Sequence, residues 1–165
     1  MKKGIYPGTF DPVTNGHLDL VQRGLRIFGE IIVAVAPSPK KQPLFTLEER
    51  LALIRESVKG YKNVRVEAFN GLVVEYAKSR GGAAIIRGLR AVSDFEYELQ
   101  MALMNRRLDM SVETVFMMPS EEYSFLTSTI VKEAASFGGS VKGLVPEAVE
   151  RALSEKFRVV EDIAE

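Results

Sequence analysis

The strongest constraint on the fold is the alternation of short apolar runs with amphipathic stretches along the 165-residue chain. Five apolar runs, most of them rich in valine and isoleucine, predict strands at residues 3–7, 30–36, 63–69, 83–88 and 112–118. Apolar residues at helical spacing predict helices at residues 16–28, 47–58, 71–79, 94–108 and 128–137. Strands that alternate with helices favour a parallel sheet with right-handed crossovers. We therefore expect an α/β fold, a doubly wound sheet of five parallel strands with helices on both faces.

Local signals predict where several helices begin and end. The pairs Thr46 with Glu49 and Ser93 with Glu96 have the spacing of capping boxes, and Pro146 can open a last helix. Thr14 is a plausible N-cap, which places His17 in the first turn of its helix. We expect one domain over residues 1–165, with a C-terminal helix and tail from about residue 146. The charged tail after about residue 155 either packs at the surface or is partly disordered.

Composition excludes several classes of function. The chain has 22 lysine and arginine residues against 22 aspartate and glutamate residues, so it has no overall charge to attract nucleic acid or membranes. It has no cysteine and one histidine, which excludes disulfides, thiolate nucleophiles and sites built from several histidines. No apolar signal core follows the N-terminus and no run is long enough to span a bilayer. We expect a cytoplasmic protein.

Groups that suit phosphate follow four of the five predicted strands. The carboxyl ends of parallel strands form the edge where such sheets bind ligands. Thr9 and His17 follow the first strand, paired lysines the second, two arginines the fourth, and a run of hydroxyls at a helix start the fifth. Each has an ordinary alternative as a turn, a solvated surface or a helix cap. Because all four would lie at one edge of a chain with no net charge, a phosphate site is favoured.

Several familiar motifs are absent. The chain has no Gly-x-Gly-x-x-Gly after its first strand and no Gly-x4-Gly-Lys-Ser/Thr. It also lacks Gly-x-Ser-x-Gly, so a serine hydrolase is disfavoured. A dinucleotide oxidoreductase and a P-loop protein are disfavoured in the same way.

The motifs that are present resemble a known family. TNGH at residues 14–17 resembles the (H/T)-x-G-H signature of the nucleotidyltransferase superfamily, and residues 124–132 resemble its second signature. Four blocks in order, YPGTFDPVTNGH, FTLEER, IRGLRAVSDFEYE and MPS…SFLTSTIVKE, are similar to bacterial phosphopantetheine adenylyltransferase. The resemblance runs from residue 3 to about residue 150 and implies a Rossmann-like nucleotidyltransferase domain. It also implies transfer of the adenylyl group of ATP to 4′-phosphopantetheine, giving dephospho-coenzyme A and pyrophosphate in coenzyme A synthesis.

The resemblance implies roles for particular residues. The residues that would contact ATP are Thr9, Phe10, His17, Gly88, Leu89, Arg90, Glu98, Tyr123, Ser124, Phe125, Leu126, Thr127, Ser128 and Thr129. Those that would hold phosphopantetheine are Thr9, Lys41, Val73 and Arg87. The catalytic residues would be His17, Thr9, Lys41 and Arg90. The second signature departs from the frequent Ile-Ser-Ser-Ser, because here it reads Leu-Thr-Ser-Thr, but every hydroxyl is kept.

The expected mechanism is direct in-line attack, with catalysis by positioning and charge stabilisation. Mg²⁺ should accompany ATP, held mainly by phosphates and water, because the sequence has no clustered carboxylates for a metal cage. Asp11 is either a metal ligand or a turn former. The resemblance also implies a homohexamer, and coenzyme A or dephospho-coenzyme A as a feedback ligand or product. The apolar residues of helix 94–108 fit either subunit contacts or a buried core helix; they are Phe95, Leu99, Met101, Leu103 and Met104.

Two other functions stay open at this point. One is an adenylyltransferase or cytidylyltransferase for another acceptor, such as nicotinamide mononucleotide, which Lys41, Val73 and Arg87 disfavour. The other is a non-catalytic nucleotide-binding protein on the same fold. The presence of His17 together with the lysine and arginine set disfavours this second function.

Overall fold

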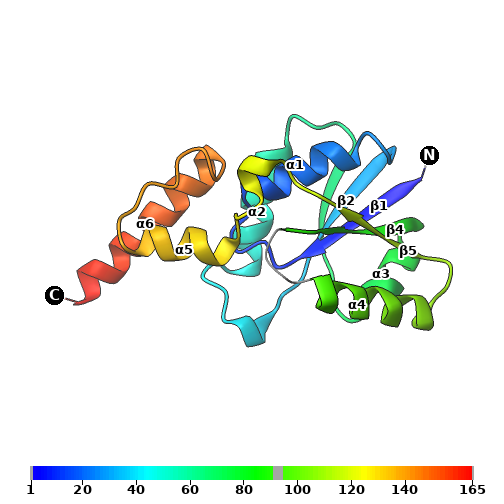
Figure 1. Cartoon of the computed structure of the whole chain (residues 1–165). Helices are drawn as coiled ribbons and strands as arrows, with labels where there is room; N and C mark the ends of the chain where they lie inside the picture. The colour runs from blue at the N-terminus through cyan, green and yellow to red at the C-terminus, as the bar shows by residue number, and fades with distance from the viewer. Residues whose placement is uncertain (1, 91–94, 165) are drawn as a thin grey trace.

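The computed structural model describes residues 2–90 and 95–164. Its centre is one sheet of five parallel strands in the order β3-β2-β1-β4-β5 (Figure 1). The predicted α/β architecture is confirmed. Each observed strand lies within a residue or two of its prediction: β1 (Lys3–Gly8), β2 (Glu30–Val35), β3 (Val64–Ala68), β4 (Gly82–Gly88) and β5 (Glu113–Met117). The order reverses between β1 and β4, and that reversal makes the switch point of the sheet.

The central strands bury both faces, because their alternate side chains enter two separate cores. Tyr6, Val33 and Ile86 enter a large core that also contains residues from four helices: α1 (Asn15–Gly24), α2 (Leu47–Val58), α5 (Ser128–Ser136) and α6 (Glu147–Ala164). Ile5 and Ile85 enter a smaller core beneath α3 (Val73–Ser79). α4 (Phe95–Leu108) lies on the same side of the sheet as α3, while α5 and α6 extend past the carboxyl ends of the strands (Figure 1).

The first helix begins as predicted but ends early. Thr14 is the N-cap and forms a capping box with His17. The helix was expected to reach Phe28 but ends at Gly24, so the C-terminal boundary was wrong. The amides of Ile27 and Phe28 both bond to the carbonyl of Gly24, which turns the chain toward β2. A Cβ at Gly24 would lie 2.5 Å from Ile31 Cδ1, so this close approach requires glycine.

The other predicted helix signals have different outcomes. Thr46 and Glu49 form the predicted capping box. Ser93, of the second predicted box, lies outside the described residues. Pro146 stands immediately before α6, and its carbonyl accepts from the amides of residues 149 and 150.

The start of the tail packs against the body of the protein. α6 continues as a helix through Ala164. Lys156 on α6 forms an ion pair with Glu49 at 2.9 Å and lies over the ring of Phe45. Lys156, at the start of the tail, therefore packs at the surface of the protein.

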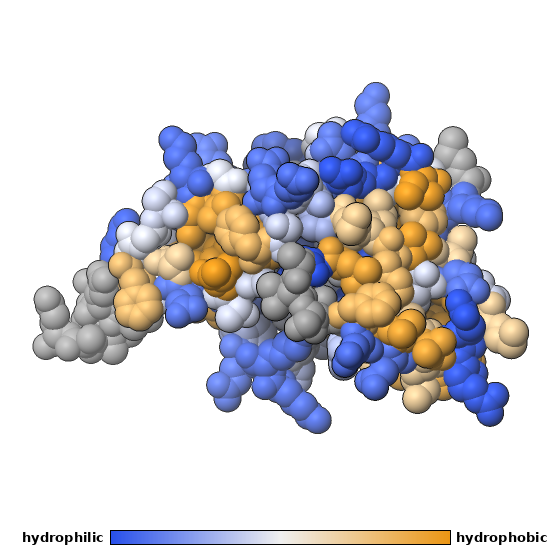
Figure 2. All heavy atoms as spheres, viewed as in Figure 1, coloured by the Kyte–Doolittle hydropathy of each residue, from blue (hydrophilic) through white to orange (hydrophobic). Residues whose placement is uncertain are grey.

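Helix α4 exposes an apolar surface to solvent. Leu103 and Met104 are each more than half exposed, and Phe95, Leu99 and Met101 are also exposed. The alternative of a wholly buried core helix was wrong. Figure 2 shows apolar side chains gathered over the part of the molecule where α4 lies. In residues 2–90 and 95–164, no helix has both the length and the apolar character needed to cross a membrane.

Candidate active site

A broad cleft lies at the carboxyl edge of the sheet, where the strand order reverses. Its volume is about 1130 Å³. The loop after β1, the segment after β2, the end of β4, one face of α4 and the start of α5 all contribute to its lining. The sequence predicted a ligand site at this edge, and the structure places this cavity there.

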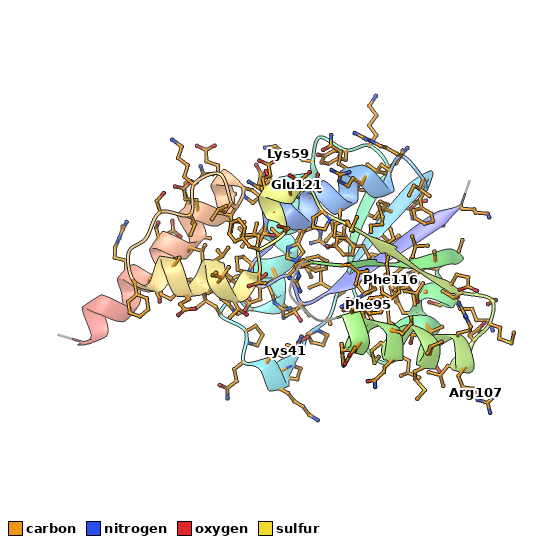
Figure 3. The ribbon with its side chains drawn as sticks, viewed as in Figure 1. Lys41, Lys59, Phe95, Arg107, Phe116 and Glu121 are labelled. Atoms are coloured by element: carbon orange, nitrogen blue, oxygen red, sulfur yellow. The ribbon has the colours of Figure 1, made fainter. Side chains whose placement is uncertain are left out.

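Most of the predicted site residues line this one cleft. They are Thr9, Phe10, His17, Lys41, Val73, Arg87, Gly88, Arg90, Glu98, Tyr123, Leu126, Thr127, Ser128 and Thr129. Three predicted residues, Leu89, Ser124 and Phe125, are not among the lining residues. Figure 3 shows Lys41 on its segment below the carboxyl ends of the strands. Gly88 also has a packing role, because a Cβ there would lie 2.6 Å from Leu20 Cδ1.

His17 is fixed in one tautomer by its own helix start. The backbone N–H of Thr14 donates to His17 Nδ1 at 2.9 Å. A backbone N–H can only donate, so Nδ1 is unprotonated and a neutral ring carries its proton on Nε2. Burial, together with the charges of Arg90 and Arg87, lowers the pKa of His17 to about 3. The ring packs edge-on against Phe10, with centroids 4.9 Å apart. His17 therefore offers the cleft a neutral N–H donor at neutral pH.

Thr9 and Lys41 form the other polar group of the cleft. Lys41 Nζ donates to Thr9 Oγ1 over a long 3.4 Å, and Thr9 Oγ1 shares a hydrogen bond of 3.0 Å with Ser38 Oγ. Lys41 lies on a short 3₁₀ turn, η1 (Pro39–Lys41), that the sequence did not predict. The residues on either side of that turn, Ser38 and Gln42, have left-handed φ values of 48° and 47°. A hydroxyl and an ammonium group thus lie together where an anion could receive hydrogen bonds from both.

Arg87 and Glu98 hold each other across the floor of the cleft. Arg87 Nε donates to Glu98 Oε2 at 2.8 Å, Nη2 donates to Glu98 Oε1, and Nη1 donates to the carbonyl of Pro7 at 3.1 Å. Burial by itself would lower the pKa of Arg87, but the hydrogen bonds and charge of Glu98 outweigh it and raise that pKa. Arg87, predicted to hold the acceptor, and Glu98, predicted to contact ATP, therefore form one bidentate ion pair.

The hydroxyls at the start of α5 divide between internal and available groups. Thr127 is the N-cap and accepts from the amide of Ile130 at 3.1 Å, which leaves its own hydrogen free to donate. Ser128 donates to the carbonyl of Pro12 at 2.7 Å and so holds α5 to the loop after β1. The capping interpretation is thus correct for Thr127. This residue also lines the cleft, where its hydroxyl can donate a hydrogen bond.

Asp11 organises a loop instead of facing open solvent. Its carboxylate accepts from the amides of Leu44 and Phe45, both at 2.9 Å, and from Lys132 Nζ at 2.7 Å. The residue is 4% exposed. The sequence alternatives were a metal ligand and a turn former, whereas these contacts join Asp11 to residues that are distant in sequence. Within the described ranges, no three histidine, cysteine, aspartate or glutamate side chains cluster as a metal site would require.

Sequence reasoning missed several lining residues, among them Ser38, Met101, Asn105 and Lys132. Lys132 stands inside the quoted SFLTSTIVKE block and could have been found there. Met101 and Asn105 follow Glu98 at helical spacing, so the face of α4 that carries Glu98 predicts them once that residue is placed in the cleft.

The fold and this cleft define a class of protein. Residues 5–134 match the family model described as cytidylyltransferase-like. A solved structure from Vibrio parahaemolyticus, provisionally assigned as a nicotinate-nucleotide adenylyltransferase, superimposes with a TM-score of 0.68. The superposition covers 93% of this chain and 99% of the other chain. Because the two sequences are 16% identical, this similarity supports the fold alone. The chain has the fold of the nucleotidyltransferase superfamily.

Curated relatives identify the family within that class. The phosphopantetheine adenylyltransferase of Thermodesulfovibrio yellowstonii is 61% identical over 158 residues, which is 95% of this chain and 98% of the relative. That of Alkaliphilus oremlandii is 57% identical over 157 residues, covering 95% and 100% of the two chains. The chain belongs to the phosphopantetheine adenylyltransferase family, and it is an enzyme of the nucleotidyltransferase class.

Proposed function

We propose that this chain transfers the adenylyl group of ATP to 4′-phosphopantetheine, releasing dephospho-coenzyme A and pyrophosphate. The observation that carries the proposal is the meeting of two anion-binding groups in one cleft. His17 lies at the start of α1 and Arg90 follows β4, while Thr9 on the loop after β1 meets Lys41 on the segment after β2. Two phosphate-bearing substrates can then face each other between them. The alternative acceptors and the non-catalytic binder have no comparable support.

The reaction needs no protein nucleophile. An oxygen of the phosphopantetheine phosphate attacks the α-phosphorus of ATP in line, and the bond from that phosphorus to the bridging oxygen of pyrophosphate breaks. A phosphate monoester is already anionic, so it needs no general base. His17 donates a hydrogen bond from Nε2 and keeps its proton, while Arg90, Lys41 and Thr9 stabilise the charge on the oxygens.

The proposed assignments extend to the remaining predicted residues. Phe10, Gly88, Leu89, Glu98 and residues 123–129 would adjoin ATP. Val73 and Arg87 would adjoin the acceptor. Glu98 accepts from two nitrogens of the Arg87 guanidinium. To bind a phosphate as well, the guanidinium must either share these N–H groups between the two anions or rotate. The Arg87–Glu98 pair would therefore orient the guanidinium before the acceptor arrives.

We propose that Mg²⁺ enters as the partner of ATP. Asp11, the tempting protein ligand, uses its carboxylate on two amides and Lys132. Magnesium accepts phosphate oxygens and water as ligands, so the nucleotide itself can supply its coordination. When bound, the ion would neutralise charge on the phosphates, and it would be lost on chelation together with turnover.

We propose a cytoplasmic homohexamer with coenzyme A or dephospho-coenzyme A as further ligands of the same cleft. The exposed apolar side chains of α4 support assembly, since such surfaces are usually covered by a partner. Light scattering should then report six times the 18.3 kDa mass of the chain.

The activity test is direct. Purified protein is mixed with ATP, Mg²⁺ and 4′-phosphopantetheine, and pyrophosphate release is followed with a parallel sample that contains nicotinamide mononucleotide. Release with phosphopantetheine alone supports the proposal. Release with the other acceptor alone would keep the chemistry and change the substrate.

A further inference from the structure

Arg50 is a buried cation that the substrate assignments do not include. It lies on α2 and is 1% exposed. In the described part of the chain, its four side-chain hydrogen bonds end on backbone carbonyls: Thr9 at 2.8 Å, Ala36 at 2.7 Å, Pro37 at 2.9 Å and Phe45 at 3.2 Å. A guanidinium has five N–H donors in a rigid plane, so it can fix several carbonyls relative to one another.

These carbonyls belong to the two loops that form one side of the cleft. Residues 36 and 37 begin the segment that follows β2, and residue 45 ends it. Arg50 therefore ties both ends of segment 36–45 to each other and to the loop after β1. Lys41 lies in the exposed middle of that segment, so its position depends on how the two ends are held.

Asp11 also holds the C-terminal end of this segment. It accepts from the amides of Leu44 and Phe45, while Arg50 takes the carbonyl of Phe45. Asp11 is in turn paired with Lys132 on α5. The C-terminal end of segment 36–45 is thus fixed through its amides and through its carbonyl.

Burial of the Arg50 cation is costly and lowers its pKa although the charges of Asp11 and Glu48 favour it, and an apolar side chain of similar size could fill the same space. What an apolar side chain cannot do is orient four carbonyls. We propose that Arg50 is a positioning residue for adenylyl transfer, holding segment 36–45 against the loop after β1 so that Lys41 and Thr9 meet the acceptor phosphate together. The inference rests on the proposed function, because it takes Lys41 and Thr9 as the acceptor-side pair.

The kinetic test uses two substitutions at Arg50 and one control on the same helix. Arg50→Met removes every donor, and Arg50→Lys keeps the charge without the fork. The control is Arg55→Met, because Arg55 is exposed and makes one long hydrogen bond of 3.4 Å to the carbonyl of Val66. Initial rates are measured against phosphopantetheine and against ATP, with the concentration of folded enzyme determined for each variant.

Misplacement of a substrate-binding group by about 1 Å can cost about 100-fold in rate. We expect kcat/KM for phosphopantetheine to fall about 100-fold in Arg50→Met and about tenfold in Arg50→Lys, with the KM for ATP within about twofold of wild type. Kinetics equal to those of Arg55→Met would overturn the inference. So would a loss of folded enzyme with both KM values unchanged, since that is the signature of a purely structural role. If Arg50→Met does not fold, Arg50→Lys decides alone.

Hydrogen exchange separates this inference from the proposed function. In the native chain the amides of Lys41, Leu44 and Phe45 are hydrogen-bonded. Arg50→Lys should speed exchange at these amides about tenfold, while exchange in the central strands matches that of Arg55→Met. If wild-type protein releases no pyrophosphate with phosphopantetheine, the proposed function fails. Unchanged exchange in segment 36–45 of Arg50→Lys would overturn the positioning role in either case.

Discussion

Substitution of His17 separates an effect on turnover from an effect on stability, because the two nitrogens of its ring have different roles. Nδ1 accepts the Thr14 amide in the capping box, and Nε2 is left to donate into the cleft. Loss of a capping interaction costs about 1 kcal/mol of folding free energy. Loss of one donor to transition-state charge costs about 10²–10³ in turnover, equivalent to about 2.7–4 kcal/mol. His17→Ala should therefore lose about 10²–10³ in kcat while its free energy of unfolding falls by about 1 kcal/mol.

His17→Glu is the matched control for the capping role. A glutamate at the third helical position can accept from the N-cap amide and suits the positive end of the helix. This variant should keep or exceed wild-type stability yet be at least as inactive as His17→Ala, since it has no donor and repels phosphate. Pyrophosphate release and urea unfolding measure the two quantities. An alanine variant with turnover near wild type would refute the reasoning, as would activity that simply follows stability across the two variants.

Three further predictions follow from the site and from α4. Nitrogen NMR of the one histidine should show a neutral ring protonated at Nε2. The ring should not titrate between pH 5 and pH 8, because the pKa of His17 is lowered to about 3. A titration midpoint near pH 6.5 would contradict the hydrogen-bond assignment. Asp11→Asn should lower the free energy of unfolding in urea by about 1–3 kcal/mol, because it removes the charge that pairs with Lys132. The control is Glu147→Gln, which breaks an exposed ion pair with Arg151. An Asp11→Asn cost no larger than that of the control would refute the prediction. Met104→Glu should reduce the mass found by light scattering, because the exposed side chain lies on the proposed subunit contact; an unchanged mass would remove α4 from the interface.

The pH dependence of stability has a definite sign at His17. Its folded pKa of about 3 lies below the ordinary value of 6.5, so the unfolded chain binds the extra proton between these two values. His17 therefore lowers the free energy of unfolding as the pH falls from about 6.5 toward 3, and it has no such effect above pH 6.5. Because His17→Ala lacks this contribution, the stability difference between it and wild type should shrink as the pH is lowered.

The sheet was predictable because its strands are buried on both faces. Such strands are continuous apolar runs, because neighbouring residues such as Ile31 and Ile32 of β2 enter the two different cores. Helix ends were predictable where a cap was local, as at Thr14, and wrong where tertiary contact decided them. Gly24 ends its helix because the chain must turn there beside Ile31.

The site was predictable in place and only partly in its contacts. Residues that follow strands in a doubly wound sheet meet at one edge, so His17, Lys41 and Arg90 could be grouped from spacing. The pairing of Arg87 with Glu98 could not, because it depends on how α4 lies across the end of β4. Arg50 looked like an ordinary helix residue, since its importance lies in carbonyls that are distant in sequence.

The measurement that tests the central claim most directly is pyrophosphate release by the purified chain with ATP and Mg²⁺. Phosphopantetheine and nicotinamide mononucleotide are offered in separate samples, with His17→Ala beside the wild type. The account predicts release with phosphopantetheine alone and a loss of about 10²–10³ in the variant. ATP binding without release in either sample would contradict it and favour a non-catalytic nucleotide-binding protein.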